Sequence, residues 1–336
     1  MTWLCGGFSD YVAVIEVRAG ALVEVRRISA GPSPAWLEPH PTRPVVYAIN
    51  EVVDGGVTPV YLEDFTWSKA IPSHGESPCH GLVLSDGSGI VVSHYLGDVV
   101  SFIRLTKGGV GVQTVVPQGT LGPVTARQDG PHPHQAVQDP FTGNVWVCNL
   151  GLDALIEYEV TDSGLEEVSR VATPAGFGPR HMMYHPSGHW RAVIGELANE
   201  VILYGHVPET TDGVRTEGWV EAGRISTIPP NWHGDNTAAA LRWSSDGTRL
   251  YASNRGDDSV TVYTLDSGVL TPVQSVPIAA GPRDFALSRD GRWALVAGQY
   301  ANLVQLLEVR GDGTLGEVVS ELSYPAPAAL LEVDCG

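Results

Sequence analysis

The amino-acid sequence repeats one pattern along most of its length, and this repetition limits the possible fold more than any other feature. Most copies contain an alternating strand, a turn with Gly, and a second alternating strand that ends in polar residues. The clearest copies are SPCHGLVLSDGSGIVVSHYLGDVVSFI from Ser77, GPRHMMYHPSGHWRAVIGELANEVILY from Gly178, NTAAALRWSSDGTRLYASNRGDDSVTVY from Asn236 and GPRDFALSRDGRWALVAGQYANLVQLLEV from Gly281. Weaker copies begin at Ser33 and His132. Short strands repeated every 40 to 50 residues or so are typical of β-propeller blades.

The number of copies follows from their spacing. The leading residues, which open the first strand of each copy, are separated by 44, 55, 46, 59 and 44 positions. They are Pro34, Pro78, Pro133, Pro179, Ala238 and Pro282. A further 45 positions lead to Pro327, where APAALLEV supplies one strand, and the missing strands of that unit stand at the N-terminus in WLCGGFSDYVAVIEV and ALVEVRRIS. Seven units in 336 residues average 48 residues each.

We therefore predict an all-β fold, a seven-bladed β-propeller with four-stranded antiparallel blades. The last blade is closed by N- and C-terminal strands, so that no surface between blades is left open to water. The extra residues in the two longest spacings are interpreted as loops rather than linkers, which predicts a single domain over residues 1–336. Hydrophobic residues make up 43% of the chain, enough to form a large core.

Charge and motif content exclude several classes of protein. Asp and Glu number 38 against 20 Lys and Arg, and this net charge of −18 disfavours nucleic acid as a partner. No apolar run approaches the roughly 18 residues of a membrane span, and the N-terminus lacks signal-peptide features, so we expect a cytoplasmic protein with no membrane partner. The cysteines are isolated and no His/Cys spacing is of the metal-binding type, which predicts buried thiols, no metal and no cofactor. The oligomeric state is left open between monomer and dimer.

Equivalent positions of the copies predict a cluster of polar side chains. The residue after each leading residue and the residue that ends the second strand are 16 positions apart in every complete copy. Across a tight hairpin this spacing places the two opposite each other, at an end of the blade that should ring one mouth of the central channel. The polar residues at these positions are Glu51, Tyr95, His134, Arg180, Glu196, Arg255, Arg283 and Gln299.

The arginines in this set predict a binding site for a small anion. A guanidinium group offers paired donors to carboxylate or phosphate, and a local cationic cluster is a strong signal on an acidic protein. The structural alternative is a wet channel whose side chains satisfy each other, as Arg180 and Glu196 could across their hairpin. His80 and His181, one position farther along their strands, are expected to point to the opposite face and to bond backbone groups between blades.

These residues resemble a known family, the seven-bladed propeller lactonases, which includes propeller-type 6-phosphogluconolactonases and fungal carboxy-cis,cis-muconate cyclases. SPCHGLVLSDG, HPHQA, GPRHMMYHPSG, SNRGDDSVTVY and GPRDFALSRDGRWALVAGQ are similar to its blade signatures, in the same order over nearly the whole chain. The resemblance implies catalytic roles for four residues, His134 (or its neighbour His132), Arg180, Glu196 and Arg255. We expect the substrate to be bound by His132, Glu51, Tyr95, Arg283 and Gln299.

The sequence departs from the family at three motifs of the mouth. HYLGD at residues 94–98 replaces NYGGG, GEL at 195–197 replaces NEL, and AGQ at 297–299 replaces ANQ. These changes affect the prediction of the substrate rather than the prediction of the fold.

The leading functional prediction is hydrolysis of the lactone of an anionic sugar acid, with 6-phosphogluconolactone as the representative substrate. His134 is the expected base because an imidazole titrates near neutral pH, while Arg180 and Arg255 would hold the substrate anion and the oxyanion. Glu196 would orient Arg180 or transfer a proton. Two alternatives stay open, a cyclase or isomerase acting on a carboxylated muconate, and a non-enzymatic propeller that binds other proteins.

Overall fold

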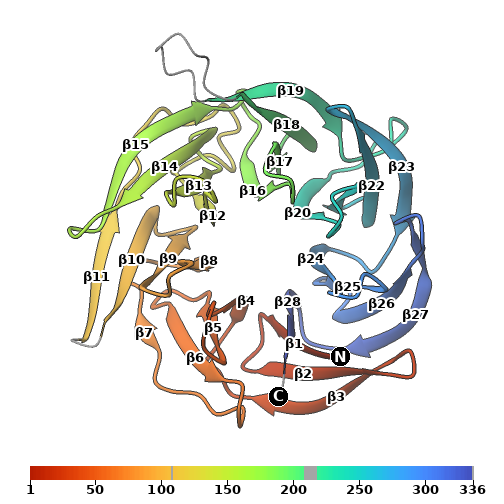
Figure 1. The fold of residues 1–336 in the computed structure, drawn as a ribbon, viewed down its shortest axis with the longest axis horizontal. Coiled ribbons are helices and arrows are strands. Elements are labelled where there is room, and N and C mark those ends of the chain that lie inside the picture. The colour runs from red at the N-terminus through yellow and green to blue at the C-terminus, as the bar shows by residue number, and fades with distance from the viewer. Residues whose placement is uncertain (107–108, 208–217, 335–336) are drawn as a thin grey trace.

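The computed structural model describes residues 1–106, 109–207 and 218–334. In this part of the chain the regular elements are strands, arranged as seven four-stranded antiparallel sheets around a central axis (Figure 1). The predicted all-β, seven-bladed propeller is therefore confirmed. None of the described residues belongs to a helix long and apolar enough to cross a membrane.

Each blade contributes one strand to each of four concentric positions. The innermost strands are β4 (Pro34–Pro39), β8 (Pro78–Val83), β12 (Pro133–Gln138), β16 (Pro179–Tyr184), β20 (Thr237–Trp243), β24 (Pro282–Leu287) and β28 (Pro327–Val333). The second strands are β5 (Val45–Asn50), β9 (Gly89–His94), β13 (Val145–Asn149), β17 (Trp190–Gly195), β21 (Arg249–Arg255), β25 (Trp293–Gly298) and β1 (Thr2–Gly7).

The third and fourth strands of each blade lie farther from the central axis. The third strands are β6 (Gly56–Tyr61), β10 (Val99–Thr106), β14 (Ala154–Val160), β18 (Glu200–Val207), β22 (Ser259–Asp266), β26 (Leu303–Val309) and β2 (Val12–Arg18). The outermost strands are β7 (Ile71–Pro72), β11 (Gly109–Val115), β15 (Leu165–Ala172), β19 (Gly218–Ser226), β23 (Val269–Pro277), β27 (Leu315–Ser323) and β3 (Ala21–Ile28).

The ring is closed by strands from both ends of the chain, as predicted. The C-terminal strand β28 pairs antiparallel with β1, so that Cys5 faces Leu330 and Leu4 faces Leu331. In Figure 1 the red N-terminal strands and the blue β28 share one blade. Closure gives the first and last parts of the sequence the same inter-blade packing that all other blades have.

The core of the protein lies between neighbouring blades. Each of seven buried hydrophobic clusters joins two adjacent sheets, for example Trp3 and Ile15 of the closing blade with Leu295 and Leu306 of the blade before it. This arrangement follows from the alternation of the strands, which gives each sheet an apolar surface on both faces.

A register shift at the start of the innermost strands determines which side chains reach the axis. In β16, Pro179 pairs with Gly195 and His181 with Ile194, so Arg180 is the extra residue of a β-bulge. Single extra residues stand at the equivalent positions Ala35, Cys79 and Arg283. A bulge bends the strand and redirects its side chains, which is why it commonly occurs beside functional sites.

The predicted pairing of positions 16 apart is present in the backbone. The amide of Glu196 donates to the carbonyl of Gly178 at 2.8 Å, immediately beside the bulge that carries Arg180. Equivalent bonds link the amides of Glu51 and Gln299 to the carbonyls that precede their leading residues, at 2.8 and 2.9 Å. The two positions of each pair therefore lie at the same end of the blade. We call this end of the ring the mouth.

One expectation about histidines was wrong. His181 does not point away from the site, because Arg180 Nη1 donates to its Nε2 at 3.0 Å and its ring meets that of His134 edge-on at 5.3 Å. The bulge accounts for the error, since strict alternation no longer holds where an extra residue is inserted. His80 does accept a bond from a neighbouring blade, from the Ala136 amide at 3.4 Å, and its ring also lies 6.2 Å from that of His181.

Candidate active site

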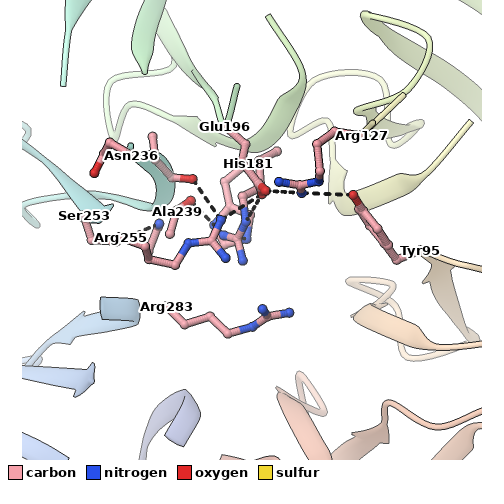
Figure 2. Close-up of polar contacts among 12 residues, drawn as sticks. Tyr95, Arg127, His181, Glu196, Asn236, Ala239, Ser253, Arg255 and Arg283 are labelled. Atoms are coloured by element: carbon pink, nitrogen blue, oxygen red, sulfur yellow. Dashed lines mark hydrogen bonds and ion pairs between the residues drawn. The ribbon is translucent and has the colours of Figure 1, made fainter. Parts of the chain in front are cut away.

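Glu196 lies at the centre of a cluster of guanidinium groups at the mouth. Arg180 Nε and Arg255 Nη2 each lie 3.0 Å from Glu196 Oε2, and Arg127 Nη2 donates to Oε1. Figure 2 shows Arg127 and Arg255 reaching this carboxylate from different sides. One carboxylate thus holds three arginines from three parts of the chain in fixed positions.

Burial and charge have opposite effects on this cluster. Burial alone would raise the pKa of Glu196, but the guanidinium groups of Arg255, Arg180 and Arg127 outweigh it and lower that pKa to about 2. Burial and the neighbouring Arg255 lower the pKa of Arg180 to about 9. Glu196 is therefore ionised at neutral pH and is a weak base. The expected contact of Arg180 with Glu196 is present, so the mutual satisfaction that the structural alternative anticipated is partly realised.

Arg127 is a site residue that the sequence did not reveal. It lies in the connection of residues 116–132 between β11 and β12, and its Nη2 also donates to the Tyr95 hydroxyl at 3.1 Å. Residues of such a connection have no equivalent in the other blades, so comparison of the copies cannot place them. The only sign of it in the sequence was the spacing of 55 rather than 44 positions before Pro133, which indicates a longer connection before that strand.

His132 and His134 differ in their availability for chemistry. Both ring nitrogens of His132 face oxygen acceptors, with Nδ1 2.7 Å from the Tyr95 carbonyl and Nε2 2.8 Å from Asp129 Oδ1. Its ring also stacks on Tyr95 at 4.6 Å. His132 therefore fixes the loop that carries Arg127, whereas the candidate base is His134.

His134 is 4% exposed, and its Nδ1 has no hydrogen-bond partner among the described residues. Burial, followed by the charges of Arg180 and Arg283, holds its pKa well below the usual range of an imidazole. The ring is therefore neutral near pH 7, and it is a weaker base than a free imidazole. His181 is neutral as well, because a nitrogen that accepts from Arg180 carries no proton.

A second ion pair lies at the same mouth. Arg283 Nη2 lies 3.5 Å from Glu51 Oε2, and the Arg283 guanidinium stacks over the Phe8 ring at 5.0 Å. Burial raises the pKa of Glu51, although Arg283 and Arg180 act in the opposite direction. The side-chain oxygen of Gln299, another residue predicted to bind the substrate, is buried without a partner in the described part of the chain.

The balance of charge at the mouth favours an anionic ligand. The ion pairs of this cluster join four guanidinium groups and two carboxylates, from Arg127, Arg180, Arg255, Arg283, Glu51 and Glu196. Within these ion pairs the positive groups exceed the negative ones by two, on a chain whose net charge is −18, while Asp98 and Asp129 lie beside them against His132. Within residues 1–106, 109–207 and 218–334, no three His, Cys, Asp or Glu side chains are grouped as metal ligands would be. The available chemistry is thus anion binding, oxyanion stabilisation and proton transfer through imidazole.

Comparisons with known proteins agree with this architecture. The chain is 26% identical over 342 residues to a 6-phosphogluconolactonase of Bacillus subtilis, covering 98% of this chain and 96% of that protein. A protein of known structure from Lactobacillus plantarum is 26% identical, with a TM-score of 0.88 over 99% of this chain and 100% of its own. The periplasmic gluconolactonase of Pseudomonas aeruginosa shares the fold with a TM-score of 0.89 at 22% identity, over 100% and 99% of the two chains.

The family assignment rests on a match to nearly the entire sequence. The model of the family described as "Lactonase, 7-bladed beta-propeller" matches residues 5–332, which run from β1 to β28. Since the match spans every blade, the chain belongs to the seven-bladed β-propeller lactonase family.

Proposed function

We propose that this protein hydrolyses the lactone of an anionic sugar acid, with 6-phosphogluconolactone as the representative substrate. The observation that supports this most directly is the convergence of four arginines around Glu196 and Glu51 at one mouth. An excess of fixed guanidinium groups can stabilise both a substrate anion and the oxyanion that forms during ester hydrolysis. The B. subtilis relative, named a 6-phosphogluconolactonase, supports the same class of substrate.

In the proposed reaction a water molecule attacks the lactone carbonyl while His134 takes a proton from that water. The carbonyl oxygen becomes an oxyanion in the field of Arg180 and Arg255, whose positions are fixed by Glu196. The bond between the carbonyl carbon and the ring oxygen then breaks. The proton held by His134 passes to the departing alkoxide, so the ring opens to a hydroxy acid and the imidazole returns to its neutral form.

The base in this proposal is His134 rather than Glu196. Both groups are weakened as bases, since the pKa of Glu196 is about 2 and that of His134 lies well below its usual range. Both oxygens of Glu196, however, are already held by guanidinium groups. His134 is neutral and has an unpartnered ring nitrogen. Glu196 acts in this scheme by positioning the arginines. We also propose the cytoplasm as the location, as expected for a sugar-phosphate substrate, although the Pseudomonas relative is named periplasmic.

The test is a measurement of proton release from freshly prepared 6-phosphogluconolactone and glucono-δ-lactone, compared with the loss of ultraviolet absorbance of carboxymuconate. We expect release above the spontaneous rate for the lactones, unchanged by a metal chelator, and no consumption of the muconate. Loss of muconate absorbance without lactone hydrolysis would instead support the cyclase. Absence of both activities would favour a binding role for the propeller.

A further inference from the structure

The arginines at the mouth are not equally available to a ligand. Arg180 Nη1 donates to His181 and to the Ala239 carbonyl at 2.8 Å, and its Nε faces Glu196. Arg255 Nη2 is directed at Glu196 and lies 3.4 Å from the Ala238 carbonyl. Their side chains are only 3% and 8% exposed. Both guanidinium groups are therefore buried, although Arg255 Nε has no hydrogen-bond partner among the described residues.

Arg127 differs from them in exposure. Its side chain is 38% exposed, and both of its contacts, to Tyr95 and Glu196, are made by Nη2. No contact within the described residues involves its Nε or Nη1. Because Tyr95 and Glu196 hold Nη2, the Nε and Nη1 donors are fixed in orientation but open to a ligand.

Arg283 approaches the same space from another blade. Figure 2 shows its side chain extending from β24 toward the space below Arg127 and Glu196. Its ion pair with Glu51, which is the one it makes among the described residues, is long at 3.5 Å, and the Phe8 ring supports the guanidinium from one side. Arg283 is therefore a second guanidinium whose donors are only weakly engaged.

We infer that Arg127 and Arg283 form the subsite that binds the phosphate of the proposed substrate. The open Nε and Nη1 of Arg127 can each donate to a ligand oxygen, and two guanidinium groups match the charge of a phosphate dianion better than that of a single carboxylate. Arg180 and Arg255 are then left for the reacting carbonyl. This inference rests on the proposed function for the identity of the reaction, but its binding test does not depend on turnover.

The experiment measures the affinities of 6-phosphogluconate and gluconate by calorimetry for the parent protein and for Arg127→Gln, Arg283→Gln and Arg127→Lys. The readout is the ratio of the two affinities, which cancels any general damage to the site. We expect the parent to bind the phosphorylated acid at least about tenfold more tightly. Each Gln variant should reduce that ratio about tenfold or more, and Arg127→Lys by less, because it keeps the charge.

Arg18→Gln is the matched control, since Arg18 is 60% exposed, pairs with a glutamate, and lies on β2 away from the mouth. It should leave the ratio unchanged, and each variant should still unfold cooperatively, which shows that it is folded. An unchanged ratio in both Gln variants, or equal parent affinity for the two acids, would overturn the subsite. Phosphate-selective binding without any lactone hydrolysis would support the subsite while rejecting the proposed function. Hydrolysis of both lactones with an unchanged ratio would reject only the subsite.

Discussion

At the scale of single residues, Glu196 determines how much positive charge the mouth can hold. Its carboxylate compensates Arg180, which is almost completely buried and would otherwise be an unpaired internal charge. We expect Glu196→Gln to lower the free energy of unfolding at pH 7 by about 3 to 5 kcal/mol, the usual cost of breaking a buried ion pair. Urea denaturation measures this change. Glu16→Gln is the control, because it breaks an exposed pair with Arg18 and should cost less than about 1 kcal/mol.

The same carboxylate predicts a pH dependence. The pKa of Glu196 is lowered from 4.5 to about 2, so its contribution to stability is complete above pH 4.5 and is lost as the pH falls toward 2. The difference in unfolding free energy between parent and Glu196→Gln should therefore shrink through this window. A difference that stays constant from pH 5 to pH 2 would contradict the assignment of an ionised Glu196.

His134 carries the proton transfer in the proposed reaction. His134→Gln should reduce kcat by about two to four orders of magnitude with little change in KM, since proton transfer is needed in the transition state and not for binding. Steady-state lactone hydrolysis provides the measurement, with the exposed His189→Gln as control. If KM rose while kcat held steady, His134 would be a binding group rather than the base.

At the scale of elements, the start of each innermost strand determines the geometry of the site. Gly178 has φ of +60° where it precedes the bulge of β16, and a Cβ there would lie 2.6 Å from Leu197 Cγ. Gly178→Ala should therefore destabilise the protein by about 1 to 3 kcal/mol and also reduce activity, because Arg180 and Glu196 flank the strained position. Gly223→Ala on β19, where an added Cβ meets nothing within 4 Å, should change stability by less than about 0.5 kcal/mol. Equal effects of the two substitutions in thermal denaturation would show that the backbone of Gly178 is not critical.

At the scale of the whole molecule, closure of the ring determines stability. Removing residues 327–336 deletes β28, exposes one edge of β1 and uncovers apolar residues such as Leu330. We expect this truncated protein to lose cooperative thermal unfolding and much of its solubility, because both faces of the last interface are opened. Removing only residues 334–336 leaves β28 whole and should preserve the parent melting curve. A 1–326 protein that melts like the parent would contradict closure as the source of stability.

The ring and the equivalent positions around its mouth could be predicted from the amino-acid sequence. Strand alternation and the spacing of turns are local properties, so seven copies of one pattern are sufficient to predict seven blades and to align Arg180, Glu196, Arg255 and His134 at equivalent places. The strand that begins at Pro327 and the strands at the N-terminus are parts of one repeat unit. The sequence therefore also predicted that β28 closes the ring by pairing with β1.

The surroundings of those positions depend on contacts that form only in the folded protein. His181 turns toward the axis because a β-bulge interrupts the alternation on which its predicted direction depended. Arg127 reaches Glu196 from a connection without any repeat, where the chain path depends on packing against Tyr95 and His132 rather than on local pattern. The low pKa of Glu196 likewise arises from three guanidinium groups that are distant in the sequence. Local periodicity specifies a backbone that repeats, whereas contacts between unlike segments arise only when that backbone has closed into a ring.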